Sequence, residues 1–459
     1  MTPSKTYHFI GIGGAGMSPI AEILLLKGEP VSGSDLKETP ITRFLESQGA
    51  KISYGHSKKA IVNTKQIVVS SAISQKNPEI KEAIAQNIPI MKRAEMLAQL
   101  MAPFPKRMAV AGTHGKTTTT GMLAAIFELA NQSPTFLVGS ECIHSGKRAQ
   151  LGKSDTFITE SDESDGSFLL LSPNSGVITN IEKEHMNYFK TKANLMDHFR
   201  EFMTKIVGEG GHLVLNKDDL NTQQLLTPEI SKNAIFFGFD ETAELSATDL
   251  RHTPDGSIFQ LNVKGKGCGE VHLKVHGAHN IYNALAAMAL ALKEDLPLGK
   301  IIEGIQSFQG TKRRLQKIST HQGIRVYDDY AHHPTEIQHT LLTVKLSFPG
   351  RVICVFQPHR YSRTQNLMKE FFAAFDSADK LIISDIYSAG EDPIEGVKPE
   401  KLVAEINKRN VSAEHVGSNE AILDHLIKTT EPGDIVVTMG AGDISQVAHG
   451  LAKHLETSH

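Results

Sequence analysis

Short apolar runs alternate with stretches of helical periodicity along the chain, and this alternation predicts an α/β fold. Near the N-terminus, residues 7–12 and 66–71 have the pattern of buried strands, while residues 17–27 have helical spacing. Two prolines within residues 101–107 then interrupt the pattern. Because proline disfavours helix and strand interiors, we expect a first domain over residues 1–104.

The pattern changes again in the middle of the chain. Short alternating runs between about residues 210 and 275 predict antiparallel strands added to the central sheet. We therefore expect an α/β protein of three domains: an N-terminal Rossmann-like domain (1–104), a central P-loop ATPase-like domain with added antiparallel strands (105–311) and a C-terminal Rossmann-like domain (312–459). Further strands are expected at residues 107–111, 156–159, 176–181, 325–327, 351–356, 380–384 and 434–439, and helices at 370–375 and 399–408.

The composition of the chain argues against nucleic acid and membranes as binding partners. The 459 residues carry a formal net charge of −3, so no overall basic field is available for nucleic acid or an anionic membrane surface. The chain has no run of roughly 18 apolar residues that would span a membrane, and its N-terminus lacks the apolar core of a signal peptide. Cys142, Cys268 and Cys354 lie far apart, as expected of free thiols in a reducing compartment. We expect a cytoplasmic protein whose phosphate binding depends on local loops.

A glycine-rich turn follows the first expected strand. Gly11, Gly13 and Gly16 form a GxGxxG pattern between a strand and a helix, and Asp35 lies where the next strand should end. Glycines let a diphosphate approach the backbone, and the helix N-terminus supplies N–H donors. Taken alone the pattern favours binding of NAD. The same residues are also compatible with a UDP-sugar, or with a tight turn that binds no ligand.

A second glycine-rich loop follows the strand that opens the central segment. Val110 replaces the first glycine of the P-loop motif, but Gly112 and Gly115 still free the backbone to wrap phosphates. Lys116 can neutralise β- and γ-phosphate oxygens, and Thr117 can hold Mg²⁺. The loop therefore predicts binding of a nucleoside triphosphate.

An acidic run at residues 160–165 follows the expected strand 156–159. Carboxylates at the end of a buried strand in a P-loop fold lie close to the bound metal, so the run is a candidate metal-binding segment. His185 follows the strand 176–181 in the same way, and its neutral imidazole is a candidate ligand of a second metal, although Mg²⁺ prefers oxygen ligands. The simpler interpretations are a solvated loop and a structural histidine.

Several clusters of polar residues lie between residues 280 and 363. In doubly wound sheets the strand ends face the ligand crevice, so these clusters are expected to line an interdomain cleft. Arginines at strand ends are suited to binding phosphate and carboxylate groups. For the pair His332 and His333 we favour a role in positioning ligands by hydrogen bonds over metal binding. The clustered residues are Asn280, Asn283, Arg313, Arg314, Asp328, Asp329, His332, His333, Arg360 and Arg363.

Taken in order, these clusters resemble the motifs of the Mur ligase family over nearly the whole chain. The sequence departs from the family pattern at Glu184 and Asn187, where aspartates are expected, so the surroundings of His185 are expected to differ. The matching stretches are GIGGAGMS, SSAI (70–73), GTHGKTTTT, ESDESDGSF, NIE..H, HN..NALAA, DDYAHHPTE, FQPHRYSRT, YSAGE (387–391) and GAGD (440–443).

The resemblance implies an ATP-dependent ligase. It is closest to the branch that joins L-alanine to the lactyl carboxylate of UDP-N-acetylmuramate through an acyl phosphate, the first amino-acid addition in peptidoglycan precursor synthesis. It places the UDP-sugar at the N-terminal turn instead of NAD, ATP with Mg²⁺ (or Mn²⁺) on the central loop, and the amino acid near the C-terminal domain. Whether the protein is a monomer or a weak homodimer stays open.

Carried over to this sequence, the resemblance implies four sets of contacts. The UDP-sugar would contact Gly13, Gly14, Ala15, Gly16, Met17, Ser18, Asp35, Ser71 and Ala72. ATP would contact Gly112, Thr113, His114, Gly115, Lys116, Thr117, Thr118, Asn280, Asn283, Arg313, Arg314 and Asp329. The metal ligands would be Thr117, Glu160 and His185, and the catalytic residues Lys116, His332, Arg360 and Arg363.

Three other functions use some of the same residues. A sister ligase that attaches a whole tripeptide to the same UDP-sugar is the nearest, although RYSRT and YSAGE favour the branch that adds an amino acid. An NAD-dependent dehydrogenase would leave GTHGKTTTT without a role. An ATP-gated sensor of UDP-sugars would use both nucleotide sites but not the row of metal and arginine candidates.

Overall fold

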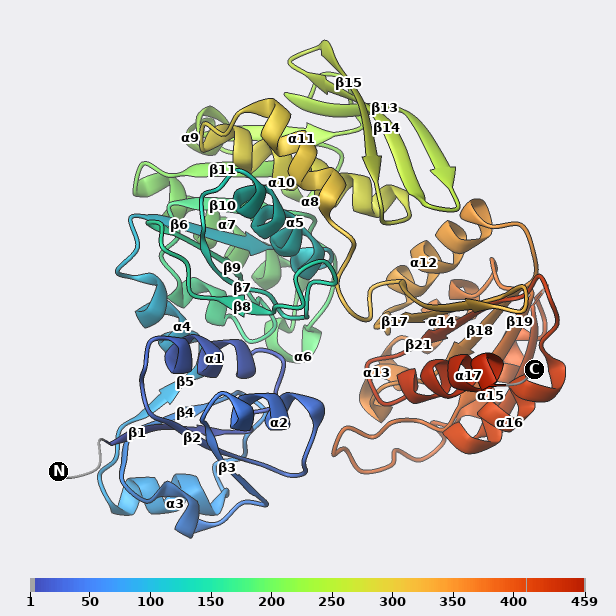
Figure 1. Cartoon of the computed structure of the whole chain (residues 1–459), viewed down its shortest axis with the longest axis horizontal. Helices are drawn as coiled ribbons and strands as arrows, with labels where there is room; N and C mark the ends of the chain where they lie inside the picture. The colour runs from blue at the N-terminus through green and yellow to red at the C-terminus, as the bar shows by residue number, and fades with distance from the viewer. Residues whose placement is uncertain (1–4, 410, 458–459) are drawn as a thin grey trace. The chain divides into compact units, whose positions relative to one another are not determined.

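The computed structural model describes residues 5–409 and 411–457, whose strands form three sheets flanked by helices (Figure 1). No described helix combines the length and the apolar character needed to cross a bilayer. The chain divides into two compact units. The first comprises Met1–Thr248, Leu261–Gly269 and Tyr282–Phe308, and the second comprises Asp249–Gln260, Glu270–Ile281 and Gln309–His459.

The first sheet is parallel, with helices joining its strands. Its strands are β1 (Thr6–Ile10), β2 (Val31–Asp35), β3 (Lys51–Tyr54), β4 (Thr64–Val69) and β5 (Ile90–Lys92), and its helices are α1 (Ser18–Leu26), α2 (Pro40–Ser47), η1 (Lys58–Ile61), α3 (Pro78–Ala85) and α4 (Arg93–Met101). The order β3-β2-β1-β4-β5 reverses direction between β1 and β4, which is where such sheets bind ligands. The glycine turn follows β1 and precedes α1, as predicted.

A buried polar network crosses this first sheet. Glu79 of α3 is fully buried, and its carboxylate lies 2.9 Å from Nε2 of His8 on β1 and 2.9 Å from Nδ1 of His56. Ser34 of β2 donates a hydrogen bond of 2.8 Å to the same carboxylate, and Ser32 lies 2.9 Å from Nδ1 of His8. Burial would raise the pKa of Glu79, but hydrogen bonds from His8, Ser34 and His56 lower it overall. The network therefore holds an ionised carboxylate inside the sheet–helix layer.

The central sheet has ten strands. These are β6 (Lys106–Ala111), β7 (Thr135–Leu137), β8 (Ala149–Gln150), β9 (Thr156–Glu160), β10 (Ser175–Ile178), β11 (His212–Asn216), β12 (Ala234–Gly238), β13 (Leu245–Thr253), β14 (Gly256–Val263) and β15 (Lys266–Leu273), in the order β15-β14-β13-β12-β11-β10-β6-β9-β7-β8. Strand β6 lies between β10 and β9 and is parallel to both. The loops after these three strands therefore meet at one edge of the sheet.

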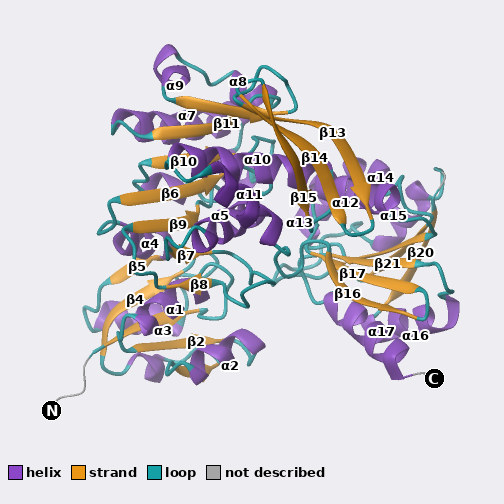
Figure 2. Cartoon of the chain, turned by 45° about the horizontal axis from the view of Figure 1, so that its top comes forward, coloured by secondary structure: helices purple, strands orange, loops and turns teal. Residues whose placement is uncertain are grey.

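Helices cover both faces of the central sheet (Figure 2). They are α5 (Lys116–Leu129), η2 (Ser167–Leu170), α6 (Met186–Phe189), α7 (Lys192–Gly208), α8 (Leu220–Gln223), α9 (Pro228–Lys232), α10 (Ala278–Lys293) and α11 (Leu298–Ser307). Helix α7 buries Phe199, Phe202 and Ile206 against one face. On the other face α11 packs against α5, where a side chain at Gly304 would lie 2.6 Å from Cα of Ile126. Glycine at this position allows the close approach of the two helices.

The prediction of antiparallel strands between about 210 and 275 is correct only for the last part of that region. Strands β11 and β12 pair in parallel, and β12 pairs in parallel with β13. The segment between β11 and β12 contains α8 and α9 and is long enough for a parallel crossover. Strands β13, β14 and β15 are neighbours joined by two-residue turns, and such short turns connect only antiparallel strands.

The third sheet belongs to the second unit. Its strands are β16 (Gln316–His321), β17 (Ile324–Asp329), β18 (Val352–Phe356), β19 (Lys380–Ser384), β20 (Ser412–Gly417) and β21 (Ile435–Met439), and its helices are α12 (Pro334–Ser347), α13 (Tyr361–Asn366), α14 (Met368–Ala374), α15 (Pro399–Ile406), α16 (Asn419–Thr429) and α17 (Ser445–Thr457). The order is β16-β17-β21-β18-β19-β20, and only β16 is antiparallel to its neighbour. Separate hydrophobic clusters under α12, α14 and α15 and under α16 and α17 fill the two faces. The predicted strands 351–356, 380–384 and 434–439 are confirmed to within one residue.

The cysteines are free thiols, as predicted. Cys142 and Cys354 are buried, whereas Cys268 of β15 is partly exposed. Burial raises the pKa of Cys142 to about 12 and raises the pKa of Cys354 even more strongly. Neither buried cysteine is therefore a thiolate near neutral pH.

A buried histidine makes the second unit sensitive to acid. His276 is 9% exposed, its ring centroid lies 5.0 Å from that of Phe348, and burial lowers its pKa from 6.5 to about 4. Between these values the unfolded chain binds a proton that the folded chain does not, so stability falls as pH falls through this window. At about pH 5 this costs about 2 kcal/mol of unfolding free energy relative to neutral pH.

The measurement is the urea midpoint of wild type and His276→Gln at neutral pH and at about pH 5. Glutamine does not titrate, so the variant should lose less stability than wild type on acidification. Equal losses in both proteins would contradict the assignment of acid sensitivity to His276.

Candidate active site

The N-terminal glycine turn presents its backbone at the carboxyl edge of the first sheet. The N–H group of Gly13 donates a hydrogen bond of 2.8 Å to Oδ2 of Asp35, which ends β2. Gly14, Ala15 and Gly16 are exposed, as are Ser71 and Ala72 in the loop after β4. Met17 and Ser18 are buried, so their side chains belong to the start of α1 and not to an open surface. The residues predicted to contact a UDP-sugar thus gather at the point where strand order reverses.

The central glycine loop is tightly held, and its glycines are required by their surroundings. Gly112 and Gly115 have φ values of 126° and 85°, in the left-handed region. A Cβ atom on Gly112 would lie 2.1 Å from Oγ1 of Thr179, and one on Gly115 would lie 2.2 Å from Oδ1 of Asn283. Helix α5 begins directly after the loop at Lys116. The loop therefore directs the N–H groups of a helix N-terminus into the space above β6.

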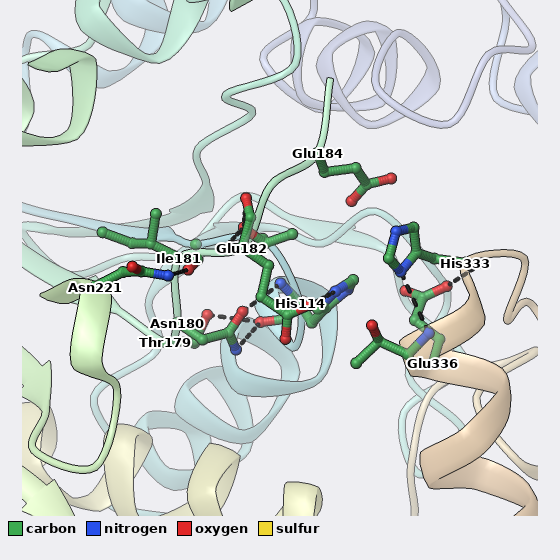
Figure 3. Close-up of polar contacts among 12 residues, drawn as sticks. His114, Thr179, Asn180, Ile181, Glu182, Glu184, Asn221, His333 and Glu336 are labelled. Carbon is green, nitrogen blue, oxygen red and sulfur yellow. Dashed lines mark hydrogen bonds and ion pairs between the residues drawn. The ribbon is translucent and has the colours of Figure 1, made fainter. Parts of the chain in front are cut away.

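The segment after β10 fixes the conformation of this loop (Figure 3). The backbone carbonyl of His114 accepts hydrogen bonds from Thr179 Oγ1 at 2.6 Å and from Asn180 Nδ2 at 3.1 Å. The backbone N–H of His114 donates to Asn180 Oδ1 at 3.0 Å. Glu182 donates its N–H to Thr113 Oγ1 at 2.8 Å. Asn221 donates to the Ile181 carbonyl at 2.6 Å and so braces the same segment. The NIE motif is thus a support for the phosphate loop.

Lys116 lies folded back over its own loop. Its Nζ atom donates to the carbonyls of Gly112 at 2.6 Å and Thr113 at 3.0 Å, and to Oε1 of Glu163 at 2.9 Å. Burial opposes the charge of Lys116, but Glu163 and Asp162 raise its pKa overall. Burial raises the pKa of Glu163 to about 7, although Lys116 opposes that rise. The site therefore holds an ammonium group whose counter-ion lies in the acidic run.

The predicted metal ligands lie around this ion pair. Thr117 Oγ1 donates to Oε2 of Glu160 at 3.1 Å, and the N–H of Gly139 donates to the other oxygen of Glu160. His185 directly precedes α6 and has a left-handed φ of 56°, and its Nε2 atom lies 3.7 Å from Oε1 of Glu163. Glu163 therefore links Lys116 to His185. The sequence analysis did not single out Glu163, although the repeated carboxylates of ESDESDG were the available signal.

In the second unit, the end of β17 holds two buried aspartates. Both carboxylate oxygens of Asp329 accept backbone N–H groups, from Leu315 at 2.6 Å and from Ala331 at 2.6 Å. Burial raises the pKa of Asp329 to about 7, and Arg314 opposes the rise. Arg313 donates to the Gly440 carbonyl at 2.5 Å, with its Nε 3.3 Å from a carboxylate oxygen of Asp328. Arg313 thus joins the ends of β17 and β21.

Asn280 and Asn283, predicted to share a helix face, lie on α10. Asn280 donates its amide to the His276 carbonyl at 2.8 Å. Asn283 accepts a hydrogen bond of 3.3 Å from Thr119 of α5, beside Gly115. Asn283 therefore lies within the phosphate-loop region of the first unit.

The histidine and arginine candidates of the second unit gather after β17 and β18. His332 Nδ1 lies 3.0 Å from the Tyr330 carbonyl, an acceptor, so this nitrogen carries a proton. His359 stacks on Tyr387, with ring centroids 5.6 Å apart, and its Nδ1 lies 3.1 Å from Nη1 of Arg363. Burial, together with Arg363 and other positive neighbours, lowers the pKa of His359 to about 3, so it is neutral. Arg360 has a left-handed φ of 71° at the start of α13.

His359 was not selected from the sequence, because a histidine beside two arginines gives no signal of its own. The structure stacks it on Tyr387 of the YSAGE stretch, which was used only to recognise the family and its branch. His359 and Tyr387 also pair as an isolated parallel bridge. Two motifs that are separate in the sequence are therefore parts of one cluster.

Comparison with known families assigns a class to this arrangement. Residues 6–105 match the Mur ligase family, catalytic domain, residues 110–291 match the Mur ligase middle domain, and residues 313–442 match the Mur ligase, glutamate ligase domain. The chain belongs to the Mur ligase family. The family resemblance and the three-domain α/β fold class predicted from the sequence are therefore confirmed.

Individual relatives are more specific. The chain is 44% identical over 450 residues to the UDP-N-acetylmuramate–L-alanine ligase of Geotalea uraniireducens, with 98% of each chain covered. It is 43% identical over 454 residues to the enzyme of the same name from Geobacter sulfurreducens, covering 98% of this chain and 97% of that one.

Solved structures agree with this grouping. The crystal structure of UDP-N-acetylmuramate-alanine ligase from Thermotoga maritima superposes with a TM-score of 0.86 at 27% identity, covering 99% of this chain and 100% of that one. A murein peptide ligase from Psychrobacter arcticus is 22% identical with a TM-score of 0.71 and shares the fold.

Proposed function

We propose that this chain joins L-alanine to the lactyl carboxylate of UDP-N-acetylmuramate at the expense of ATP, as the first amino-acid addition in peptidoglycan precursor synthesis. The structural observation that carries the proposal is the phosphate loop with Lys116 paired to Glu163, beside the Thr117–Glu160 pair. Full-length similarity to L-alanine ligases supports the choice of amino acid. In this proposal the domains span residues 1–104, 105–311 and 312–459, and the reaction takes place in the cytoplasm.

ATP makes an unreactive carboxylate reactive. A carboxylate oxygen attacks the γ-phosphorus of ATP, and the bond between this phosphorus and the bridging β–γ oxygen breaks. ADP departs, and the substrate carboxylate has become an acyl phosphate. The neutral amine of L-alanine then attacks the acyl carbon, inorganic phosphate leaves, and the nitrogen loses its proton. Lys116, freed from its own loop carbonyls, would stabilise the charge on the transferred phosphoryl group by position and electrostatics.

The residues around the phosphate loop fit a divalent metal. Thr117 and Glu160 offer the oxygen ligands that Mg²⁺ prefers, and His185 offers an imidazole that Mn²⁺ accepts more readily. When bound, the metal would neutralise phosphate charge and hold the phosphoryl group in line. Glu160 is already oriented for this role by the Gly139 N–H and the Thr117 hydroxyl.

The remaining predicted residues receive proposed roles by location. The turn at Gly13–Ser18, with Asp35, Ser71 and Ala72, would bind the UDP-sugar. Asn283 would contact ATP beside Gly115, and Asn280, Arg313, Arg314 and Asp329 are the further proposed ATP contacts. His332, Arg360 and Arg363 would bind the amino-acid carboxylate and the acyl end of the sugar, with neutral His359 as an added hydrogen-bond partner.

The test is phosphate release from ATP and Mg²⁺ with UDP-N-acetylmuramate, with amino acids supplied one at a time and a tripeptide supplied in parallel. Phosphate should appear with L-alanine or a close analogue, together with an amide product of matching mass. Release with the tripeptide alone would transfer the proposal to the sister ligase. Release that is independent of sugar and amine, or no release at all, would overturn it.

A further inference from the structure

Arg93 lies between the two nucleotide-binding loops of the first unit but belongs to none of the family motifs. It is the first residue of α4, directly after β5, and its side chain is 16% exposed. A Cβ atom on Gly16 would lie 3.0 Å from Cδ of Arg93 and 3.4 Å from both Nε and Nη1. The glycine at position 16 therefore leaves room for a guanidinium group at the exposed turn.

The other end of the same guanidinium reaches the acidic run. Nη2 of Arg93 donates to Oδ2 of Asp162 at 3.0 Å, and Asp162 Oδ1 accepts the N–H of Ser164 at 3.0 Å. Asp162 directly precedes Glu163, the buried partner of Lys116. A short path of contacts therefore runs from the N-terminal turn through Arg93 and the acidic run to the phosphate loop.

The fork of the guanidinium allows both ends to be used at once. Among the described residues, the hydrogen bond to Asp162 is the only one that this group makes, which leaves Nη1 available on the side of the turn. Guanidinium nitrogens donate charge-assisted hydrogen bonds to phosphate oxygens, and Nη1 carries two N–H donors. A diphosphate at the turn could accept these donors without displacing Asp162.

We propose that Arg93 is a positioning residue that couples the two sites: it would bind the diphosphate of the UDP-sugar and thereby hold the acidic run in the conformation that receives ATP. The proposal rests on the proposed function, because it requires a UDP-sugar at the turn. Holding the acidic run fixes Glu163, and Glu163 fixes Lys116 between its loop and the nucleotide. Each ligand should then strengthen the binding of the other by the same factor, as linkage requires.

The experiment is calorimetric titration of a non-hydrolysable ATP analogue, with Mg²⁺, into the full chain with and without saturating UDP-N-acetylmuramate. In wild type the UDP-sugar should raise analogue affinity by about 5-fold or more. The coupling ratio is the affinity for the analogue with UDP-sugar divided by the affinity without it. Arg93→Gln should lower UDP-sugar affinity by about 10-fold or more and bring the coupling ratio towards one. Asp162→Asn should leave UDP-sugar affinity near wild type and still reduce the coupling ratio.

Arg107→Gln is the matched control. Arg107 is also partly buried, with its side chain 21% exposed, and binds the Ser172 carbonyl, but it lies on β6 at the opposite edge of the sheet from the loops. Its coupling ratio should match wild type. If wild type binds the UDP-sugar but its coupling ratio is one, the inference is overturned. It is also overturned if Arg93→Gln or Asp162→Asn keeps the coupling ratio of wild type. Failure of wild type to bind UDP-N-acetylmuramate would instead overturn the proposed function and this inference together.

Discussion

Replacing Lys116 with methionine is expected to lower kcat for amide formation by at least about 10³-fold. The Nζ atom is the positive charge at the N-terminus of α5, and it is held by the carbonyls of Gly112 and Thr113 and by Glu163. Methionine keeps most of the stem but cannot stabilise phosphoryl charge. Phosphate release and the mass of the product, measured with saturating substrates, report the loss.

The same substitution leaves Glu163 buried without its counter-ion, so a folding defect has to be separated from a catalytic one. Breaking a buried ion pair by removing one partner costs about 3–5 kcal/mol. The double variant Lys116→Met/Glu163→Gln removes both charges and should recover most of the stability in urea denaturation while remaining inactive. Activity within about tenfold of wild type in the folded double variant would contradict the role of Lys116.

Replacing Glu79 with alanine is expected to reduce the free energy of unfolding by about 3–5 kcal/mol. The substitution removes the carboxylate that His8, His56 and Ser34 share and leaves a fully buried imidazole without its partner. The pH dependence follows from the lowered pKa of Glu79. Its contribution is complete above the unfolded pKa of about 4.3 and is lost as pH falls through the lower folded value. Urea unfolding as a function of pH measures both effects.

Glu82 on the same helix provides the comparison. It is only partly buried, and its carboxylate accepts a hydrogen bond from Gln86 at 2.8 Å. Alanine at this position should cost no more than about 0.5 kcal/mol. Similar losses for the two variants would show that the buried network contributes little beyond an ordinary surface contact.

The fold was predictable where hydrophobic pattern and turn chemistry agree. The strand before GIGGAGMS and the strand before GTHGKTTTT are both buried apolar runs, and each ends at glycines that the turn requires. Strands β11 and β12 were assigned the wrong direction because their short apolar patterns do not encode pairing. The helices between them decide it, and these helices are only four and five residues long.

The site was predictable in part for a similar reason. Glu160 ends β9 and Thr117 lies just after β6, the parallel neighbour of β9, so their meeting follows from strand order. Glu163 and Arg93 could not be singled out in this way, because their partners depend on how two loops fold. The ESDESDG run contains several carboxylates, and the sequence does not tell which one turns inward to Lys116.

The unequal burial of the three thiols makes the natural chain suitable for site-selective labelling. Cys142 and Cys354 are shielded, with pKa values raised by burial, whereas Cys268 is partly exposed on β15, a strand that carries no proposed ligand contact. A maleimide fluorophore at about neutral pH should therefore attach once, at Cys268, as peptide mass mapping would verify. A fluorescent reporter of ligand binding could then be made without introducing or removing any residue.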